Sequence, residues 1–269
     1  MRFVNVSFNT SKLHFSINKC VLTIVVILLF CLNSTIVHSQ TKSIDSLQTR
    51  LKTRQKEDSQ KVNLLNTLGY KYWIVDANKS IYYGKEALQL AEQINDSKGK
   101  ARANRVVGVA YWSQGFHIKA LEYLNDSHEI YDTLGDKEGV ANTRLNIGMV
   151  YSDLNDYEKA LNYYEQAINE FTGLELKGRI ATTFTKMGTI LIESGKNKEA
   201  LQYLMDALQM HIDNDFKYGV REVHNRLGKL YFNKNEIEQA SYHIKKSMSL
   251  GGELSDTHGL TDNLIVYGK

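Results

Sequence analysis

The sequence contains few residues whose type and spacing would support catalysis. It has no G-x-x-x-x-G-K-[ST] phosphate loop, no H-E-x-x-H metal-binding helix and no G-x-S-x-G nucleophile elbow. Both cysteines, Cys20 and Cys31, lie near the N-terminus, so the rest of the chain has no disulfide and no thiolate metal site. The later histidines are scattered without ligand spacing: His117, His128, His211, His224, His243 and His258. We therefore expect no enzymatic activity, no metal and no cofactor.

Tryptophan and arginine are the side chains best suited to binding. The chain has two tryptophans, Trp73 and Trp112, and Arg102 and Arg105 precede the second. Rigid aromatics with nearby arginines are the usual composition of binding hot spots, and guanidinium groups suit an acidic peptide or a carboxylate. Two alternatives stay open: the tryptophans pack between neighbouring units, or the arginines form salt bridges with acids of the next unit.

The composition indicates a helical protein without a nucleic-acid surface. The 269 residues include no proline, whereas average usage is about 5%, so the residue that most often interrupts helices is missing. Lys and Arg total 33 against 30 Asp and Glu, and the excess lies in the first 39 residues, at Arg2, Lys12 and Lys19. The remaining body is neutral, which argues against a nucleic-acid partner.

The first 39 residues have the pattern of a secretory signal peptide. A basic start is followed by the apolar run Val21 to Leu32 and then by small polar residues. This run is shorter than the roughly 20 residues that span a bilayer, so we expect cleavage after Ser39, with an uncleaved anchor as the alternative. The body is then exported, periplasmic or extracytoplasmic. It contacts a membrane only if the leader is uncleaved or a missing C-terminal part anchors the chain.

Small residues recur at a step of 40 positions through the body. One ladder is Gly108, Gly148, Gly188, Gly228 and Gly268, with Gly69 one residue out of register, and a second is Ser80, Ala120, Ala160, Ala200 and Ala240. Each ladder glycine lies on an apolar stripe of helical spacing and would let a neighbouring helix approach. Seven residues later comes a residue that tolerates the left-handed conformation ending a helix: Gly115, Asn155, Gly195 or Asn235. Each unit therefore reads as helix-turn-helix.

These units resemble the tetratricopeptide repeat family from about residue 63 to 269. They share its Leu-Gly-x-x-Tyr box, as in Leu68-Gly69 with Tyr72, and the small residue twelve positions on. The usual period is 34 with a proline after the second helix, so a period of 40 without proline resembles a long-helix branch of the family. The resemblance implies an all-α, right-handed α-solenoid.

The predicted organisation has three parts. Residues 1–39 are a signal peptide, and residues 40–60 hold an N-terminal capping helix with Ile44, Leu47 and Leu51 on one face. Residues 61–269 form a solenoid of about five repeats, followed by the first helix of a sixth that contains Gly268. Because that helix stops after Gly268, we expect a truncated or incomplete array.

The family resemblance implies a concave face lined by the first helix of each unit. It places the outward positions three before, one after and four after each ladder glycine. The candidate residues for a protein or peptide ligand, with Arg102 added, are Asn66, Tyr70, Trp73, Arg102, Arg105, Trp112, Thr185, Asn225 and Lys229.

We expect a non-enzymatic, exported scaffold that binds a protein or peptide through this concave face. The alternative is the extracytoplasmic sensor region of a truncated signalling protein of the histidine kinase, nucleotide cyclase or transcriptional regulator type. The chain resembles the N-terminal repeat region of bacterial sensor proteins that contain tetratricopeptide repeats.

Overall fold

The computed structural model describes residues 43–253, and this part of the chain is helical with no strand. A helix at 43–53 comes first. The signal peptide predicted at 1–39 and the sixth unit predicted around Gly268 lie outside the described residues. The labelled helices are α2 (Ser59–Tyr72), α3 (Ala77–Gln93), α4 (Ser97–Ser113), α5 (His117–Thr133), α6 (Lys137–Asp153), α7 (Tyr157–Gly173), α8 (Lys177–Glu193), α9 (Asn197–Asp213), α10 (Lys217–Asn233) and α11 (Ile237–Glu253).

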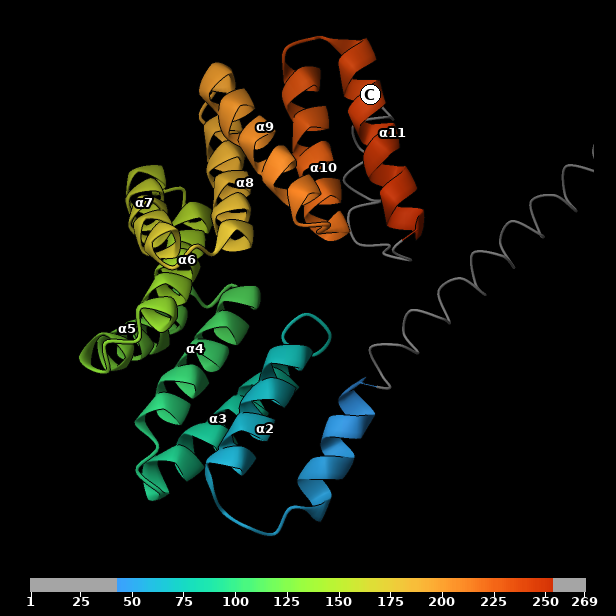
Figure 1. Cartoon of the computed structure of the whole chain (residues 1–269). Coiled ribbons are helices and arrows are strands. Elements are labelled where there is room, and N and C mark those ends of the chain that lie inside the picture. The colour runs from blue at the N-terminus through green and yellow to red at the C-terminus, as the bar shows by residue number, and fades with distance from the viewer. Residues whose placement is uncertain (1–42, 254–269) are drawn as a thin grey trace, which may run out of the picture.

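The helices form hairpins that stack into an α-solenoid, which confirms the predicted fold class. Within each unit the two helices pack together, as α4 does with α5 and α6 with α7. The first helix of each unit also contacts the first helix of the next, from α2 to α4 and onward to α10. Figure 1 shows the hairpins following one another along a curved row, from α2 in cyan to α11 in red.

The turns inside the hairpins have the backbone conformation that the sequence predicts. Gly115, Asn155, Gly195 and Asn235 have φ values of +78°, +59°, +74° and +61°. The loops between units use the left-handed region as well, at Asn95, Gly135, Glu175 and Asp215. The three units from α4 to α9 therefore each contain two left-handed turn residues, and the one inside the hairpin was predicted from the sequence.

The ladder glycines allow close helix packing. A Cβ atom on Gly148 would lie 2.5 Å from Cε1 of Tyr164, and one on Gly108 would lie 2.8 Å from Cγ of Leu124. Real Cβ atoms do not approach other carbons so closely. The second helix of each unit can therefore lie directly against the first only because these positions have no side chain.

In the first unit, different residues form the close contact between the two helices. Its glycine, Gly69, faces Ser80, whose hydroxyl donates a 2.7 Å hydrogen bond to the Gly69 carbonyl. Gly84 replaces the large residue of the other units, and the side chain of Val107 on α4 lies where its Cβ would be. Before α2, the helix at 43–53 places Ile44 in a buried cluster with Leu68. This helix ends at residue 53, seven residues before the end of the predicted capping segment.

In the described part of the chain, no helix combines the length and the apolar character needed to cross a bilayer. Over the same residues, no group of three or more His, Cys, Asp and Glu side chains is arranged to hold a metal ion.

Candidate binding groove

The inner face of the solenoid carries a groove of about 470 Å³. This volume falls within the range of ligand sites, roughly 300–1,000 Å³. Every lining residue belongs to α2, α4, α6, α8 or α10, or to the residue that follows α2, so the first helices alone build the groove. The lining residues are Tyr70, Trp73, Arg102, Arg105, Val106, Val109, Trp112, Asn142, Leu145, Asn146, Met149, Arg179, Thr182, Lys186, Tyr218 and Glu222.

Five of the sequence-predicted site residues meet in this groove: Tyr70, Trp73, Arg102, Arg105 and Trp112. Tyr70 and Trp73 come from the C-terminal end of α2, and the other three lie on one face of α4. The structure therefore brings together the aromatic and arginine residues that the sequence analysis singled out.

Four predicted residues do not line the groove. Asn66 is fully buried, and its side-chain amide donates a 3.1 Å hydrogen bond to the Gly99 carbonyl at the start of α4. Thr185 is buried with its hydroxyl donated to the Ala181 carbonyl of its own helix. Asn225 and Lys229 are half-buried outside the lining, and Lys229 pairs with Glu193. The burial of Asn66 and Thr185 corrects their expected position on the concave face, whereas that of Asn225 and Lys229 stays a prediction.

The two tryptophans stack on each other across the first two units. Their ring centroids are 6.1 Å apart with an interplanar angle of 29°. The indole Nε1 of Trp112 donates a 2.7 Å hydrogen bond to Asp153 at the end of α6, which holds this ring in place. Both interpretations of the tryptophans therefore apply, since the pair packs between units and also lines the groove next to Tyr70, which is 48% exposed.

Arg102 and Arg105 carry positive charges that no carboxylate of the described residues neutralises. Arg102 donates hydrogen bonds of 3.3 Å to Asn63 Oδ1 and to Thr67 Oγ1, both neutral acceptors on α2. Burial lowers the pKa of the Arg102 guanidinium, and the nearby charge of Arg105 lowers it further. Over residues 43–253 neither arginine has an acidic side chain within ion-pair distance, so the salt-bridge alternative is not observed there.

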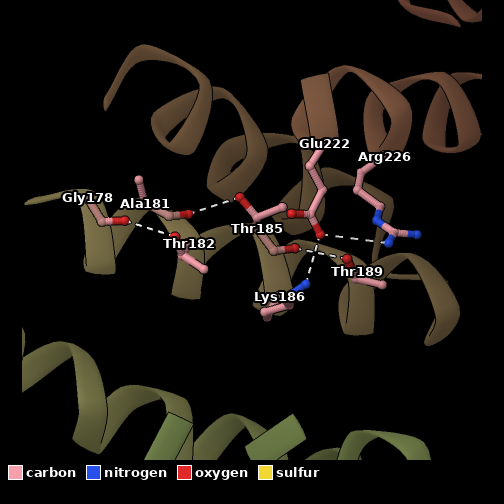
Figure 2. Close-up of polar contacts among 8 residues, drawn as sticks. All are labelled: Gly178, Ala181, Thr182, Thr185, Lys186, Thr189, Glu222 and Arg226. Carbon is pink, nitrogen blue, oxygen red and sulfur yellow. Dashed lines mark hydrogen bonds and ion pairs between the residues drawn. The ribbon is translucent and has the colours of Figure 1, made fainter. Parts of the chain in front are cut away.

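At the other end of the groove, the single lining carboxylate is paired with cations, and Arg179 lies in the same lining. Glu222 on α10 lies 2.8 Å from the Lys186 ammonium on α8 and 3.9 Å from the Arg226 guanidinium. Figure 2 shows both cations directed at this carboxylate, and three threonines of α8 bonded to their own helix. Burial alone would raise the pKa of Glu222, but Lys186 and Arg226 lower it by more, so the pKa lies below its usual value.

Several groove residues occupy offsets from the ladder glycine that were not among the predicted positions. Asn142, Thr182 and Glu222 lie six positions before their ladder glycines, and Asn146 and Lys186 lie two before. The offset of six extends the stripe of Arg105 and Trp112 by one helical turn, because residues three or four apart share a face. The offset of two lies next to the offset of three that Arg105 occupies. Arg102, chosen for its charge, has the same offset of six and was the available signal.

Comparison with known proteins supports the repeat assignment. The family model for the tetratricopeptide repeat matches residues 99–169, which span α4 to α7. No curated protein matches the sequence.

Several solved structures share the fold at low sequence identity. BtubC (BKLC) from P. vanneervenii has a TM-score of 0.61 at 18% identity, over 82% of this chain and 92% of that one. A Rap protein complexed with Competence and Sporulation Factor has a TM-score of 0.64 at 15% identity, over 82% and 73% of the two chains. The Rap conjugation gene regulator of plasmid pLS20, in complex with the Phr* peptide, has a TM-score of 0.68 at 16% identity, over 80% of this chain and 61% of that one.

These likenesses concern the fold alone, because the identities are low. Together with the matched family model, the 40-residue ladders and the stacked hairpins, they lead to one assignment. Residues 99–169 match the tetratricopeptide repeat family model, and the stacked hairpins on either side continue the same 40-residue pattern.

Proposed function

We propose that this protein is a non-enzymatic scaffold that binds a peptide, or an extended segment of a partner protein, in the groove on its inner face. The observation that carries the proposal is the composition of the groove. Both tryptophans of the chain lie in it, beside two arginines whose charges are uncompensated within the described residues. Aromatic and arginine side chains dominate binding energy in protein interfaces.

The shape of the groove favours an extended ligand. It crosses five first helices, from α2 to α10. Packed helices are about 8–10 Å apart, so four steps cover roughly 30–40 Å. An extended chain advances about 3.3 Å per residue, so about ten residues match this path.

Two asparagines in the middle of the groove suit the backbone of such a ligand. Asn142 donates its amide to the Glu138 carbonyl of its own helix, which leaves its side-chain oxygen as an acceptor. The amide nitrogen of Asn146 is buried and has no partner among the described residues. Side-chain amides pair with both the N–H and the C=O of a peptide unit.

Two of the similar proteins were solved with ligands, one with Competence and Sporulation Factor and one with the Phr* peptide. This adds support for a peptide ligand here. At 15% and 16% sequence identity the two proteins share the fold with this chain.

Site-specific photo-crosslinking in the native cell tests the proposal. A photoreactive amino acid replaces Val109 in the groove or, as a matched control, exposed Glu165 on the outer helix α7. We expect the groove position to crosslink a discrete peptide or protein that the control does not capture. Introducing Trp112→Ala or Arg105→Glu should abolish that product, and an undiminished product in both variants would exclude the groove as the binding site.

We further propose that the chain acts outside the cytoplasm. This rests on its basic start, its short apolar run and the small residues that precede Gln40. Mass spectrometry of the native protein should find an N-terminus at Gln40, and an N-terminus at Met1 would contradict cleavage.

The sensor interpretation is the alternative, in which these repeats are the sensing region of a longer signalling protein. An intact mass well above 30.7 kDa would support it.

A further inference from the structure

We propose that the loops inside the first two hairpins dock on a membrane surface that contains anionic lipids. Four exposed apolar residues form this surface, which we call the apolar edge: Ile74 and Val75 in the loop after α2, and Phe116 and Ile118 around the start of α5. The contact is peripheral and does not involve the ligand of the groove, so either proposal can fail without the other.

The two loops of the apolar edge lie side by side. The side-chain amide of Gln114 in the second loop donates a 2.8 Å hydrogen bond to Asn78 at the start of α3. The rings of Trp73 and Trp112, which come just before the two loops, are stacked. Each of the four residues of the apolar edge is 53–77% exposed. They therefore present one protruding apolar surface to the solvent.

The second loop gives up a helix cap to expose an aromatic ring. In the hairpins on either side, the residue before the second helix is Asp76 or Asp156, whose carboxylate accepts the backbone N–H three residues later. Phe116 occupies this position in the second hairpin, and α5 begins without a side-chain cap. A capping side chain would stabilise the helix, so packing and helix stability do not explain the phenylalanine.

The repeat itself shows that these apolar residues are not a requirement of the fold. One, two and three periods after Phe116 and Ile118, the same two positions carry charged residues: Asp156 and Glu158, Lys196 and Lys198, and Glu236 and Glu238. Charged residues are the usual choice at exposed loop ends of a solenoid. The apolar edge is therefore a local property of the first two hairpins.

Lysines flank the apolar edge. Segments 71–79 and 113–119 contain three lysines, Lys71, Lys79 and Lys119, against one acid, Asp76. Asp76 pairs with Lys79 at 3.6 Å, and the ammonium of Lys119 lies 5.7 Å from the centroid of the Phe116 ring. Apolar side chains enter the headgroup region of a bilayer while neighbouring lysines stay at the phosphates. This combination suits a surface that contains anionic lipids.

The described chain begins at the same edge. Helix 43–53 runs antiparallel to α2 (Figure 1), and its residues Ile44 and Gln48 contact Tyr72, the last residue of α2. The start of this helix therefore lies next to the loop that follows α2. Ten residues separate it from the apolar run Val21 to Leu32, a reach of at most about 40 Å. Export through this leader brings the apolar edge close to the membrane.

The size of the apolar edge favours a lipid surface over a protein partner. A protein interface normally uses about 20–30 residues on each side, whereas the apolar edge consists of four residues at two loop ends. A bilayer needs only a few protruding apolar side chains, because they enter it by roughly 5–10 Å. A membrane therefore matches the shape as well as the charge of this surface.

Site-specific fluorescence tests the proposal on the chain that begins at Gln40, which contains no cysteine. Ile118→Cys carries an environment-sensitive fluorophore and is mixed with phosphatidylcholine vesicles that contain about 30% phosphatidylglycerol. We expect a blue shift of the emission. Ile212→Cys is the matched control, because Ile212 is 53% exposed at the end of α9, on the opposite edge. No shift at Ile118→Cys, or an equal shift at both positions, would overturn the proposal.

Co-sedimentation with the same vesicles measures what the apolar side chains contribute. Val75→Glu/Ile118→Glu should lower the vesicle partition coefficient at least tenfold, whereas Ile212→Glu should leave it unchanged. All three side chains are exposed, so the variants should keep the circular dichroism of the parent. Undiminished binding of the double variant would contradict docking through the apolar edge. If the parent chain binds no vesicles, the proposal is wrong and a protein partner becomes the better explanation of the apolar edge.

A lysine variant tests the choice of anionic lipid. Lys71→Gln/Lys119→Gln should weaken binding to the phosphatidylglycerol vesicles by about fivefold per lysine, with little effect on pure phosphatidylcholine vesicles. The difference should shrink as the salt concentration rises. Equal losses on both kinds of vesicle would refute the part of the proposal that concerns anionic lipids.

Discussion

Replacing Gly148 by alanine tests whether the 40-residue glycine ladder exists to bring paired helices together. The added Cβ would lie 2.5 Å from Cε1 and 2.7 Å from Cδ1 of Tyr164, and 3.2 Å from the Ala160 carbonyl oxygen. Carbon atoms in contact normally lie about 3.5–4.0 Å apart, so the ring must move by about 1 Å. It has little room to do so, since Tyr164 is 1% exposed and lies in a buried cluster with Phe171.

The expected magnitude is the balance of two terms. Overpacking a well-filled core costs about 1–3 kcal/mol, and exchanging glycine for alanine inside a helix returns up to about 1 kcal/mol. We therefore expect a net loss of about 1–2 kcal/mol in the free energy of unfolding. For a helical array of this size the midpoint of thermal unfolding should fall by roughly 2–8 °C.

Urea unfolding followed by circular dichroism at 222 nm measures this loss. Gly178→Ala on α8 is the matched control, because a Cβ there would meet no atom within 4 Å. The control should unfold at the same or a higher urea concentration, since it gains helix propensity without a clash. If Gly148→Ala proves as stable as the wild type, or if both variants lose equally, the ladder glycines are not there for close helix packing.

Three further predictions concern stability. Burial lowers the pKa of His224 and His243, whose Nδ1 atoms are 2.8 Å apart, and the pKa of His243 falls to about 4. In the unfolded chain these histidines take up protons below about pH 6.5, so the free energy of unfolding should drop as pH falls from about 6.5 to 4. The double variant His224→Phe/His243→Tyr copies the aromatic pair Phe184 and Tyr203 of the preceding unit. In urea titrations at several pH values, it should lose this part of the pH dependence. Lys196→Asp should raise the free energy of unfolding by about 1 kcal/mol in the same urea assay, because α9 begins without a side-chain cap. Glu175→Gly should raise the thermal midpoint by a few degrees, with about 1 kcal/mol of backbone strain removed, since Glu175 has a φ of +56° where an earlier unit has Gly135.

The fold was predictable because its signal repeats. The left-handed turns at Gly115 and Asn155 and the close approach at Gly148 follow from residue types that recur every 40 positions. The groove was predictable only in part, because side chains at the same offset from the ladder glycine line the groove in some units and are buried between helices in others. Three positions before the glycine, a side chain lies at the border between neighbouring first helices. Arg105 is long enough to emerge into the groove, whereas Asn66 is short and stays bonded inside.

On the proposed function, the residues that choose the ligand lie outside the ladder positions. The ladder positions fix helix packing and are nearly constant from unit to unit, so they carry no information about a partner. The groove residues vary from unit to unit, since six positions before the ladder glycine the lining carries Arg102, Asn142, Thr182 and Glu222. Within the described residues, the uncompensated arginines and the paired tryptophans meet only where α2 and α4 adjoin. On the proposed function, we expect substitutions of Arg105 or Trp112 on α4 to change ligand binding without changing the fold.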